Sequence, residues 1–153
     1  AVDPWFIVAQ NPVQARLIRT AREVNDSKPH WVLEQVKKKL AECLVASDKR
    51  PSELTIACFG LAFKPNIDDL RESPAMEVAQ MIADWHQGVT QLVEPNIHEL
   101  PKGMPERSVL VTQEEALRQA DVLVMLVDHQ QFKTIDVEGL RSRWLVDTKG
   151  LWR

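Results

Sequence analysis

Two lysines follow apolar runs that have the character of buried strands. Lys64 comes shortly after the run Thr55–Leu61, and Lys149 follows the run Trp144–Val146. Ligands of parallel α/β sheets bind where the carboxyl ends of the strands meet, and a lysine there offers a point charge to a phosphate. The two lysines are therefore predicted to converge on an anionic ligand. The alternative for Lys149 is a solvated lysine near the end of the chain.

The turn that contains Lys64 differs from that of a dinucleotide-binding fold. It reads Gly-Leu-Ala-Phe-Lys-Pro-Asn from Gly60, whereas the fingerprint requires Gly-x-Gly-x-x-Gly and an acid about 20 residues further on. The acid that ends the next apolar run, Glu94, lies 34 residues past Gly60. A nucleotide other than NAD is the better expectation for this domain.

The loop that follows is long, with 12 residues between Leu61 and a helix start at Pro74. Loops of that length in compact domains are usually functional. The alternative is that this loop has only a structural role. Its basic residues, Lys64 and Arg71, could simply pair with nearby acids, namely Asp68, Asp69 and Glu72.

The remaining histidine and cysteine side chains do not predict a catalytic or metal site. His129 follows the apolar run Asp121–Val127 and could carry a proton, but a lone histidine at a strand end is more often an ordinary polar residue. Cys43 and Cys58 lie in apolar patterns and are predicted to be core residues. The sequence shows no nucleophilic triad, no pair of catalytic carboxylates and no cluster with metal-ligand spacing.

These residues need an alternating α/β framework to bring them together. Apolar runs alternate with helical patterns, which predicts a Rossmann-like parallel sheet flanked by helices and preceded by a helical connector arm. Residues 96–108 are predicted to be irregular. The expected strands are 55–61, 91–93, 121–127 and 144–146, and the expected helices run from Ser73–Pro74 to Gly88, over 113–119 with a capping box from Thr112 to Glu115, and around 130–142.

The connector arm precedes the polar linker Ser47–Glu53, which divides the chain into domains 1–50 and 51–153. Helical patterns cover 12–25, with Pro12 in the first turn, and 30–46. Pro29 either separates two helices or begins a new one after a kink. The apolar faces are too wide for one small domain to cover, so the arm is predicted to form a homodimer; they comprise Val13, Leu17, Val24, Val32, Val36 and Leu40.

Composition excludes several classes of protein. The chain has 153 residues and a net charge of −3, divided as +3 over residues 1–50 and −6 over residues 51–153. An acidic main body argues against a nucleic-acid surface. Apolar windows are too short for a transmembrane helix, and no basic segment precedes an apolar run at the start. A cytoplasmic protein is expected, and the apolar start, AVDPWFIVAQ, suggests a piece of a longer one.

One long motif carries a family resemblance. The run Phe59–Ala75 (FGLAFKPNIDDLRESPA) resembles the signature of the UDP-glucose/GDP-mannose dehydrogenase family, with support from Val24–Asn25, Ala120–Asp121, Phe132 and Asp147–Gly150. Within the family, Asp3–Phe6 and Leu92–His98 are most similar to the branch that oxidises UDP-N-acetyl-D-mannosamine. The resemblance covers the end of a dimerising connector and a C-terminal Rossmann-like domain that binds the UDP-sugar.

The resemblance implies a role for five residues. Asp3 matches an aspartate that assists proton transfer or water activation. Lys64 matches a lysine that contacts the UDP-sugar, and Phe63 matches a backbone contact to the same ligand. Arg71 matches an arginine that faces the cofactor pyrophosphate, and Lys149 stands where arginine is more common and reaches the sugar nucleotide.

The implied reaction oxidises the C6 alcohol of the sugar to a carboxylate and reduces two NAD in succession, for bacterial surface polysaccharide synthesis. The family's nucleophilic cysteine lies in a Gly-Gly-x-Cys motif ahead of Ala1, and NAD is bound mainly by a separate N-terminal domain. The chain alone is therefore expected to be inactive. Two alternatives remain open: a stand-alone nucleotide-binding module, and an oligomerisation module built on the arm.

Overall fold

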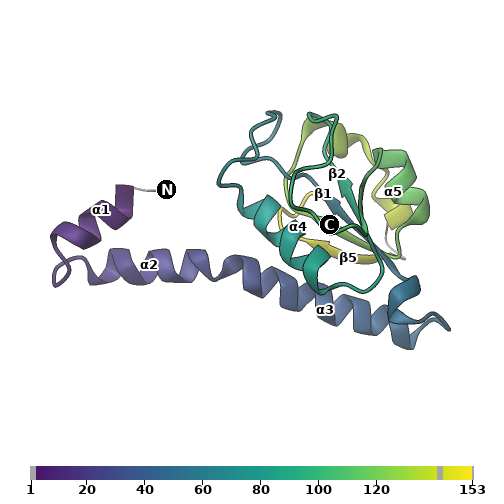
Figure 1. Ribbon diagram of the computed structural model, residues 1–153, viewed down its shortest axis with the longest axis horizontal. Helices are drawn as coiled ribbons and strands as arrows, with labels where there is room; N and C mark the ends of the chain where they lie inside the picture. Colours follow the sequence, from purple (N-terminus) through teal and green to yellow (C-terminus); the bar gives the residue numbers. More distant parts are fainter. Residues whose placement is uncertain (1–2, 141–142, 153) are drawn as a thin grey trace.

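Five parallel strands form one sheet in the order β3-β2-β1-β4-β5, which confirms the predicted α/β class (Figure 1). A computed structural model gives the positions of residues 3–140 and 143–152; the Asp3 side chain lies outside this description. The strands are β1 (Thr55–Phe59), β2 (Val89–Val93), β3 (Ser108–Leu110), β4 (Val122–Met125) and β5 (Trp144–Asp147).

The central strands are apolar at almost every position because both faces of the sheet are covered. In β1, Ile56 and Cys58 point into one layer, and Ala57 and Phe59 point into the other. All four of these side chains are fully buried. The continuous apolar run in the sequence therefore predicted a strand buried on both faces.

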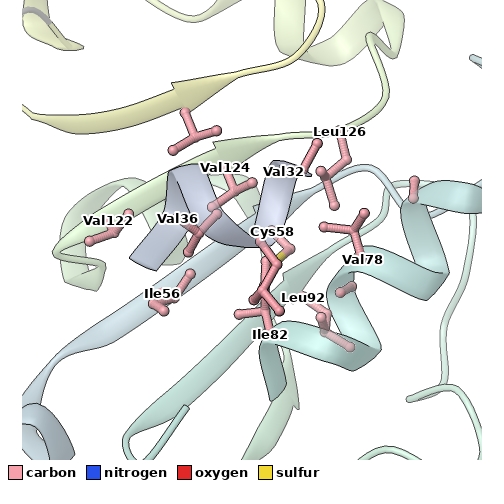
Figure 2. Packing of buried hydrophobic residues seen from close by; sticks show 14 of the residues in the cluster. Val32, Val36, Ile56, Cys58, Val78, Ile82, Leu92, Val122, Val124 and Leu126 are labelled. Carbon is pink, nitrogen blue, oxygen red and sulfur yellow. The ribbon is translucent and has the colours of Figure 1, made fainter. Parts of the chain in front are cut away.

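Helices α3 (Lys28–Val45) and α4 (Pro74–Trp85) cover the first face. Figure 2 shows Val32 and Val36 of α3 in the same apolar cluster as Ile82 of α4. The expectation that the second half of the arm would leave its apolar face uncovered is wrong, because α3 packs against β4, β5 and α4. Hydrophobic burial thus makes α3 a structural layer of the α/β body.

The opposite face is covered by α5 (Gln113–Gln119) and by two short 3-10 helices, η2 (Gln130–Thr134) and η3 (Glu138–Leu140). The prediction of one short helix around 130–142 is corrected to these two turns, and residues 141–142 lie outside the described part. Edge-to-face contacts join Phe59 to Phe132 and to Trp152, with ring centroids 5.4 and 4.9 Å apart. These aromatic contacts fix the end of the chain against the sheet.

Two predicted helix starts are confirmed. The Ser73 hydroxyl accepts the N–H of Met76 at the start of α4, and Thr112 and Glu115 form the reciprocal capping box of α5. Helix α4 ends at Trp85, three residues before the predicted stop at Gly88. The extended backbone of His86 ends it.

The arm contains α1 (Asp3–Gln10) and α2 (Arg16–Asp26), which continues almost directly into α3 (Figure 1). Pro12 does not begin α2 as predicted; it lies in a turn between α1 and α2. Pro29 stands in the first turn of α3, so the two helices are separated by Ser27. This resolves the alternative at Pro29 in favour of a new helix.

Strand β3 was not predicted from the sequence, because residues 96–108 were expected to be irregular. This strand has only three residues, pairs with β2 alone and leaves Val109 40% exposed, so it lacks an apolar run. Within residues 3–140 and 143–152, no helix is long and apolar enough to cross a membrane.

Candidate ligand pocket at the carboxyl edge of the sheet

The loop that carries Lys64 begins at Gly60, which adopts φ 85°. A Cβ on Gly60 would lie 2.5 Å from the Cβ of Val127 and 2.7 Å from its carbonyl oxygen. Glycine is required there both for the left-handed backbone and for the close approach to the end of β4. The N–H groups of the next two residues, Leu61 and Ala62, consequently point to one acceptor.

That acceptor is the Glu94 carboxylate at the end of β2. Its Oε2 accepts the N–H of Leu61 at 2.8 Å and of Ala62 at 3.1 Å, and its Oε1 accepts the N–H and the amide of Asn96 at 3.1 and 2.9 Å. Burial by itself would raise the pKa of Glu94. Hydrogen bonds from His129 and these backbone N–H groups outweigh burial and lower the pKa.

His129, in the segment after β4, completes the group. Its Nε2 lies 2.9 Å from Glu94 Oε2, and both side chains are fully buried. Its Nδ1 lies 2.9 Å from the N–H of Asn66, further along the Lys64 loop. Sequence reasoning assessed Glu94 and His129 separately, and 35 residues of separation gave no local sign of their contact.

Glu94 also explains why this domain does not suit a dinucleotide. The N–H groups after β1 are those that a dinucleotide-binding fold presents to a pyrophosphate. Here Leu61 and Ala62 donate to a carboxylate of the protein itself. The residues of this loop therefore do not fit NAD in the usual place, in agreement with the missing glycine fingerprint.

The segment after β5 is shaped by Asp147. Its Oδ1 accepts the N–H groups of Lys149 and Gly150 at 2.9 and 2.8 Å, and its Oδ2 accepts the N–H of Trp152 at 2.8 Å. This local turn holds the backbone of Lys149 at the carboxyl end of the sheet.

A pocket of about 700 Å³ lies between this segment, the Lys64 loop, the start of α4 and the junction of α2 with α3. Phe63 and Lys149 both line it, so the structure brings together two of the predicted binding residues. The lining comprises Trp5, Arg22, Asn25, Asp26, Lys28, Pro29, Val32, Ala62, Phe63, Glu72, Pro74, Ala75, Glu77, Val78, Leu126, Val127, Thr148 and Lys149.

The other predicted residues lie outside the lining. Lys64 is exposed beside the pocket, with its Nζ 5.7 Å from the Phe63 ring centroid, and it makes no ion pair within the described residues. Arg71 pairs with Asp69, as the structural alternative for the loop anticipated. Asp3 begins α1, but its side chain lies outside the described residues.

Sequence reasoning missed the contribution of the connector to the pocket. Arg22, Asn25 and Lys28 enter it from the junction of α2 and α3. Arg22 is bonded to Asp26 at 2.8 Å, whereas the Lys28 ammonium lies 4.2 Å from the Trp31 ring centroid. Asn25 belongs to the Val24–Asn25 motif, which was the one signal for this part of the site.

A second cavity, of about 900 Å³, lies at the carboxyl ends of β2 and β3. Its lining includes Glu94, Glu114 and Glu115 and contains no lysine or arginine. The smaller pocket has three basic residues in its lining, Arg22, Lys28 and Lys149, which balance its three acids, Asp26, Glu72 and Glu77. A phosphate is repelled more strongly by the uncompensated acids of the larger cavity, so charge favours the smaller pocket as the candidate site for an anion.

Neither cysteine has the environment of a nucleophile. Burial raises the pKa of Cys58 to about 12, and burial together with the Asp121 charge raises the pKa of Cys43. Both side chains are buried. Among the residues that the structure describes, no group of three or more His, Cys, Asp or Glu could hold a metal ion.

Comparison with known proteins gives a family match. The UDP binding domain model of the UDP-glucose/GDP-mannose dehydrogenase family matches residues 57–153. A UDP-N-acetyl-D-mannosamine dehydrogenase of Escherichia coli K12 is 68% identical over all 153 residues, which span 36% of that relative. An NDP-N-acetyl-D-galactosaminuronic acid dehydrogenase of Ralstonia nicotianae is 52% identical over 152 residues, 99% of this chain and 34% of the relative.

A solved structure shares the fold over nearly the whole chain. The UDP-N-acetyl-mannosamine dehydrogenase of Staphylococcus aureus superposes with a TM-score of 0.72 at 28% identity. The match covers 99% of this chain and 33% of the other. The arm and the sheet together thus match about a third of that longer chain.

Proposed function

The chain belongs to the UDP-glucose/GDP-mannose dehydrogenase family, as its motifs predicted, and we propose that it is the sugar-nucleotide-binding part of a UDP-N-acetyl-D-mannosamine dehydrogenase. The full reaction would oxidise C6 of that sugar to the carboxylate of UDP-N-acetyl-D-mannosaminuronate. The observation that carries the proposal is the pocket where Phe63 and Lys149 meet the connector. The 68% identity over the whole chain supports the sugar.

We propose that the diphosphate lies between the two lysines. Lys149 lines the pocket, and Lys64 directly follows the lining residue Phe63 on the loop after β1. The Phe63 N–H donates to the Asp69 carbonyl at 2.8 Å, so a backbone contact from Phe63 to the ligand would use its carbonyl oxygen. Such an acceptor suits the N–H of a uracil ring. Lys28 adds a third cation from the connector.

Oxidation at C6 requires a thiol that this pocket does not hold. The family resemblance assigns the covalent step to a cysteine, which forms a thiohemiacetal and then a thioester. Cys43 and Cys58 are buried and have raised pKa values, so neither supports this role. We therefore infer that these residues bind and orient the UDP-sugar, and that the chain alone oxidises nothing.

The cofactor of the proposed reaction is NAD, which accepts the hydride when bound. The Glu94 carboxylate occupies the backbone N–H groups that would receive its pyrophosphate in this domain. We propose that NAD is held mainly elsewhere and that Arg71 faces it across a domain cleft. The 88% exposed side chain of Arg71 is consistent with such a contact. We propose that Asp3 assists proton transfer or water activation, as the family resemblance implies.

The proposed partner is a second copy of the chain. No residue of α2 is buried, and its apolar residue Leu17 is 86% exposed. Val13 and Val24 are 71% and 65% exposed. An apolar face of this kind is typical of an interface, and we propose that α2 supplies a homodimer contact.

Calorimetry with UDP, UDP-N-acetylmannosamine and NAD tests the function. We expect the two uridine nucleotides to bind to the chain and NAD to bind more weakly. Tighter binding of NAD than of UDP would refute the assignment of the domain. Because both uridine nucleotides are multiply charged anions, their affinity should fall as the salt concentration rises.

A further inference from the structure

Two fully buried side chains, one after each of the two strands that flank β1, contact the Lys64 loop. Glu94 ends β2 and His129 follows β4, and a hydrogen bond of 2.9 Å joins them. The lining of the 700 Å³ pocket includes neither residue. Glu94 lines the separate 900 Å³ cavity, so any effect of this pair on the 700 Å³ pocket must act through other groups.

The hydrogen bonds identify the form of the histidine. Its Nδ1 accepts the backbone N–H of Asn66 at 2.9 Å, which requires a lone pair on that nitrogen. The other ring nitrogen, Nε2, then carries the proton and donates it to Glu94. The ring is a neutral bridge between a carboxylate and a loop.

The hydrogen bonds of Glu94 and His129 lie on both sides of the turn that carries Phe63 and Lys64. Glu94 receives the N–H groups of Leu61 and Ala62, before Phe63, and His129 receives the N–H of Asn66, after Lys64. Three backbone N–H groups, two before the turn and one after it, therefore donate to the buried pair of Glu94 and His129.

Asn66 adopts φ 64°, a left-handed conformation that asparagine tolerates better than most residues other than glycine. Its side-chain Oδ1 also accepts the N–H of Gln130 at 2.8 Å, so the loop is tied to the segment after β4 by two bonds. The left-handed residue directly follows Pro65 and lies two positions after Lys64.

We propose that His129 and Glu94 are positioning residues, which form a latch that holds the Phe63–Lys64 turn in its ligand-binding shape. The proposal rests on the proposed function of this loop. A turn that is already ordered does not have to be ordered by the ligand, so its affinity is higher. Loss of the latch should weaken UDP binding without removing any ligand contact.

Two substitutions of one residue separate the two halves of the latch. In His129→Asn, the amide oxygen takes the place of Nδ1 and still accepts the Asn66 N–H, whereas the contact with Glu94 is lost. In His129→Gln, the amide reaches the place of Nε2 and keeps Glu94, whereas the Asn66 bond is lost. Both remove the ring from the same cavity, so both should lower the melting temperature similarly.

The affinity for UDP should differ between the two variants. We expect His129→Gln to bind UDP about 5- to 10-fold more weakly than the unchanged chain, and His129→Asn to stay within about 2-fold. His98→Gln, at an exposed histidine outside the latch, serves as the matched control. Equal affinities in the two His129 variants would overturn the latch.

Amide hydrogen exchange without ligand tests the latch separately from the function. The Asn66 amide should lose protection in His129→Gln and keep it in His129→Asn. Equal protection in both variants would also overturn the proposal, whether or not UDP binds. If exchange differs as expected but Lys64→Ala leaves UDP affinity unchanged, the ligand role of Lys64 fails and the latch stands.

Discussion

The Arg71 guanidinium donates two hydrogen bonds, of 2.9 and 2.8 Å, to the carboxylate of Asp69. The Arg71 backbone N–H adds a third at 3.0 Å. The pair stands on the outside of the Lys64 loop, where the Arg71 side chain is 88% exposed and that of Asp69 is 38% exposed. The arginine is thus oriented by its own loop and remains open to solvent on its other side.

This contact predicts an unusually acidic Asp69. The side-chain hydrogen bonds from Arg71 lower its pKa to about 2. In Arg71→Ala, the Asp69 pKa should rise toward its ordinary value of about 3.9 but stay below it, because the backbone N–H of residue 71 still donates to the carboxylate. NMR titration of the carboxyl carbon measures this. Lys102→Ala should leave the Asp69 pKa unchanged. Because the pair is exposed, the melting temperature should barely move. An ordinary pKa in the unchanged chain would contradict the pair.

Lys64 and Lys149 should control UDP affinity. A hydrogen bond to a charged group contributes about 1.5–3 kcal/mol, so Lys64→Ala and Lys149→Ala should each weaken UDP binding by about 10- to 100-fold. Isothermal titration calorimetry at fixed salt measures this. Lys102→Ala removes an equal charge from a different loop and should have little effect. Unchanged affinity in either variant of Lys64 or Lys149 would remove that lysine from the site.

The two cysteines should be unreactive in the folded chain. Both are buried, and the pKa of Cys58 is raised to about 12. A thiol reagent at neutral pH should modify neither residue until a denaturant unfolds the protein.

The chain should also lack dehydrogenase activity. When it is mixed with UDP-N-acetylmannosamine and NAD, no NADH absorbance should appear. NADH formation that follows the purified chain would refute the structural role of Cys43 and Cys58.

The exposed face of α2 should mediate self-association. Leu17→Glu places a charge in the middle of that face, and we expect it to convert a dimer into a monomer in sedimentation equilibrium. Val45→Glu is the matched control, because Val45 is 91% exposed at the end of α3, outside α2. If the unchanged chain is monomeric at the highest concentration reached, the dimer contact lies elsewhere.

Acid stability should depend on Glu94. Its folded pKa is lowered relative to an unfolded value of about 4.3. The ionised form therefore stabilises the fold above that unfolded value, and the contribution is lost as the pH falls through the lower folded pKa. Stability measured by urea unfolding should decline below about pH 4.

Glu94→Gln isolates this contribution. It should lower the free energy of unfolding at pH 7 by about 1–3 kcal/mol, because backbone N–H groups lose their carboxylate acceptor. Its stability should then fall less on acidification than that of the unchanged chain. An identical acid dependence in both proteins would show that Glu94 does not titrate as described.

Local signals in the sequence determined most of the elements. Ser73 and the pair Thr112–Glu115 begin helices through capping hydrogen bonds that span no more than four residues. Both partners of each bond are therefore apparent in the sequence. The run Thr55–Leu61 predicted a buried strand because every position is apolar or small. The motif around Lys64 predicted the family for a similar reason, because it is one continuous segment.

Only the tertiary structure decided which distant groups meet. The apolar stripe of α3 could equally have faced a second copy, and packing against β4 and β5 decided otherwise. Glu94 and His129 meet because their strands end at the same edge of the sheet, although each lacks a local partner in the sequence. Burial and hydrogen bonding across the fold made this pair a support for the loop, and the same geometry placed Lys28 in the pocket. Sequence patterns report on neighbours along the chain, whereas the site is assembled from neighbours in space.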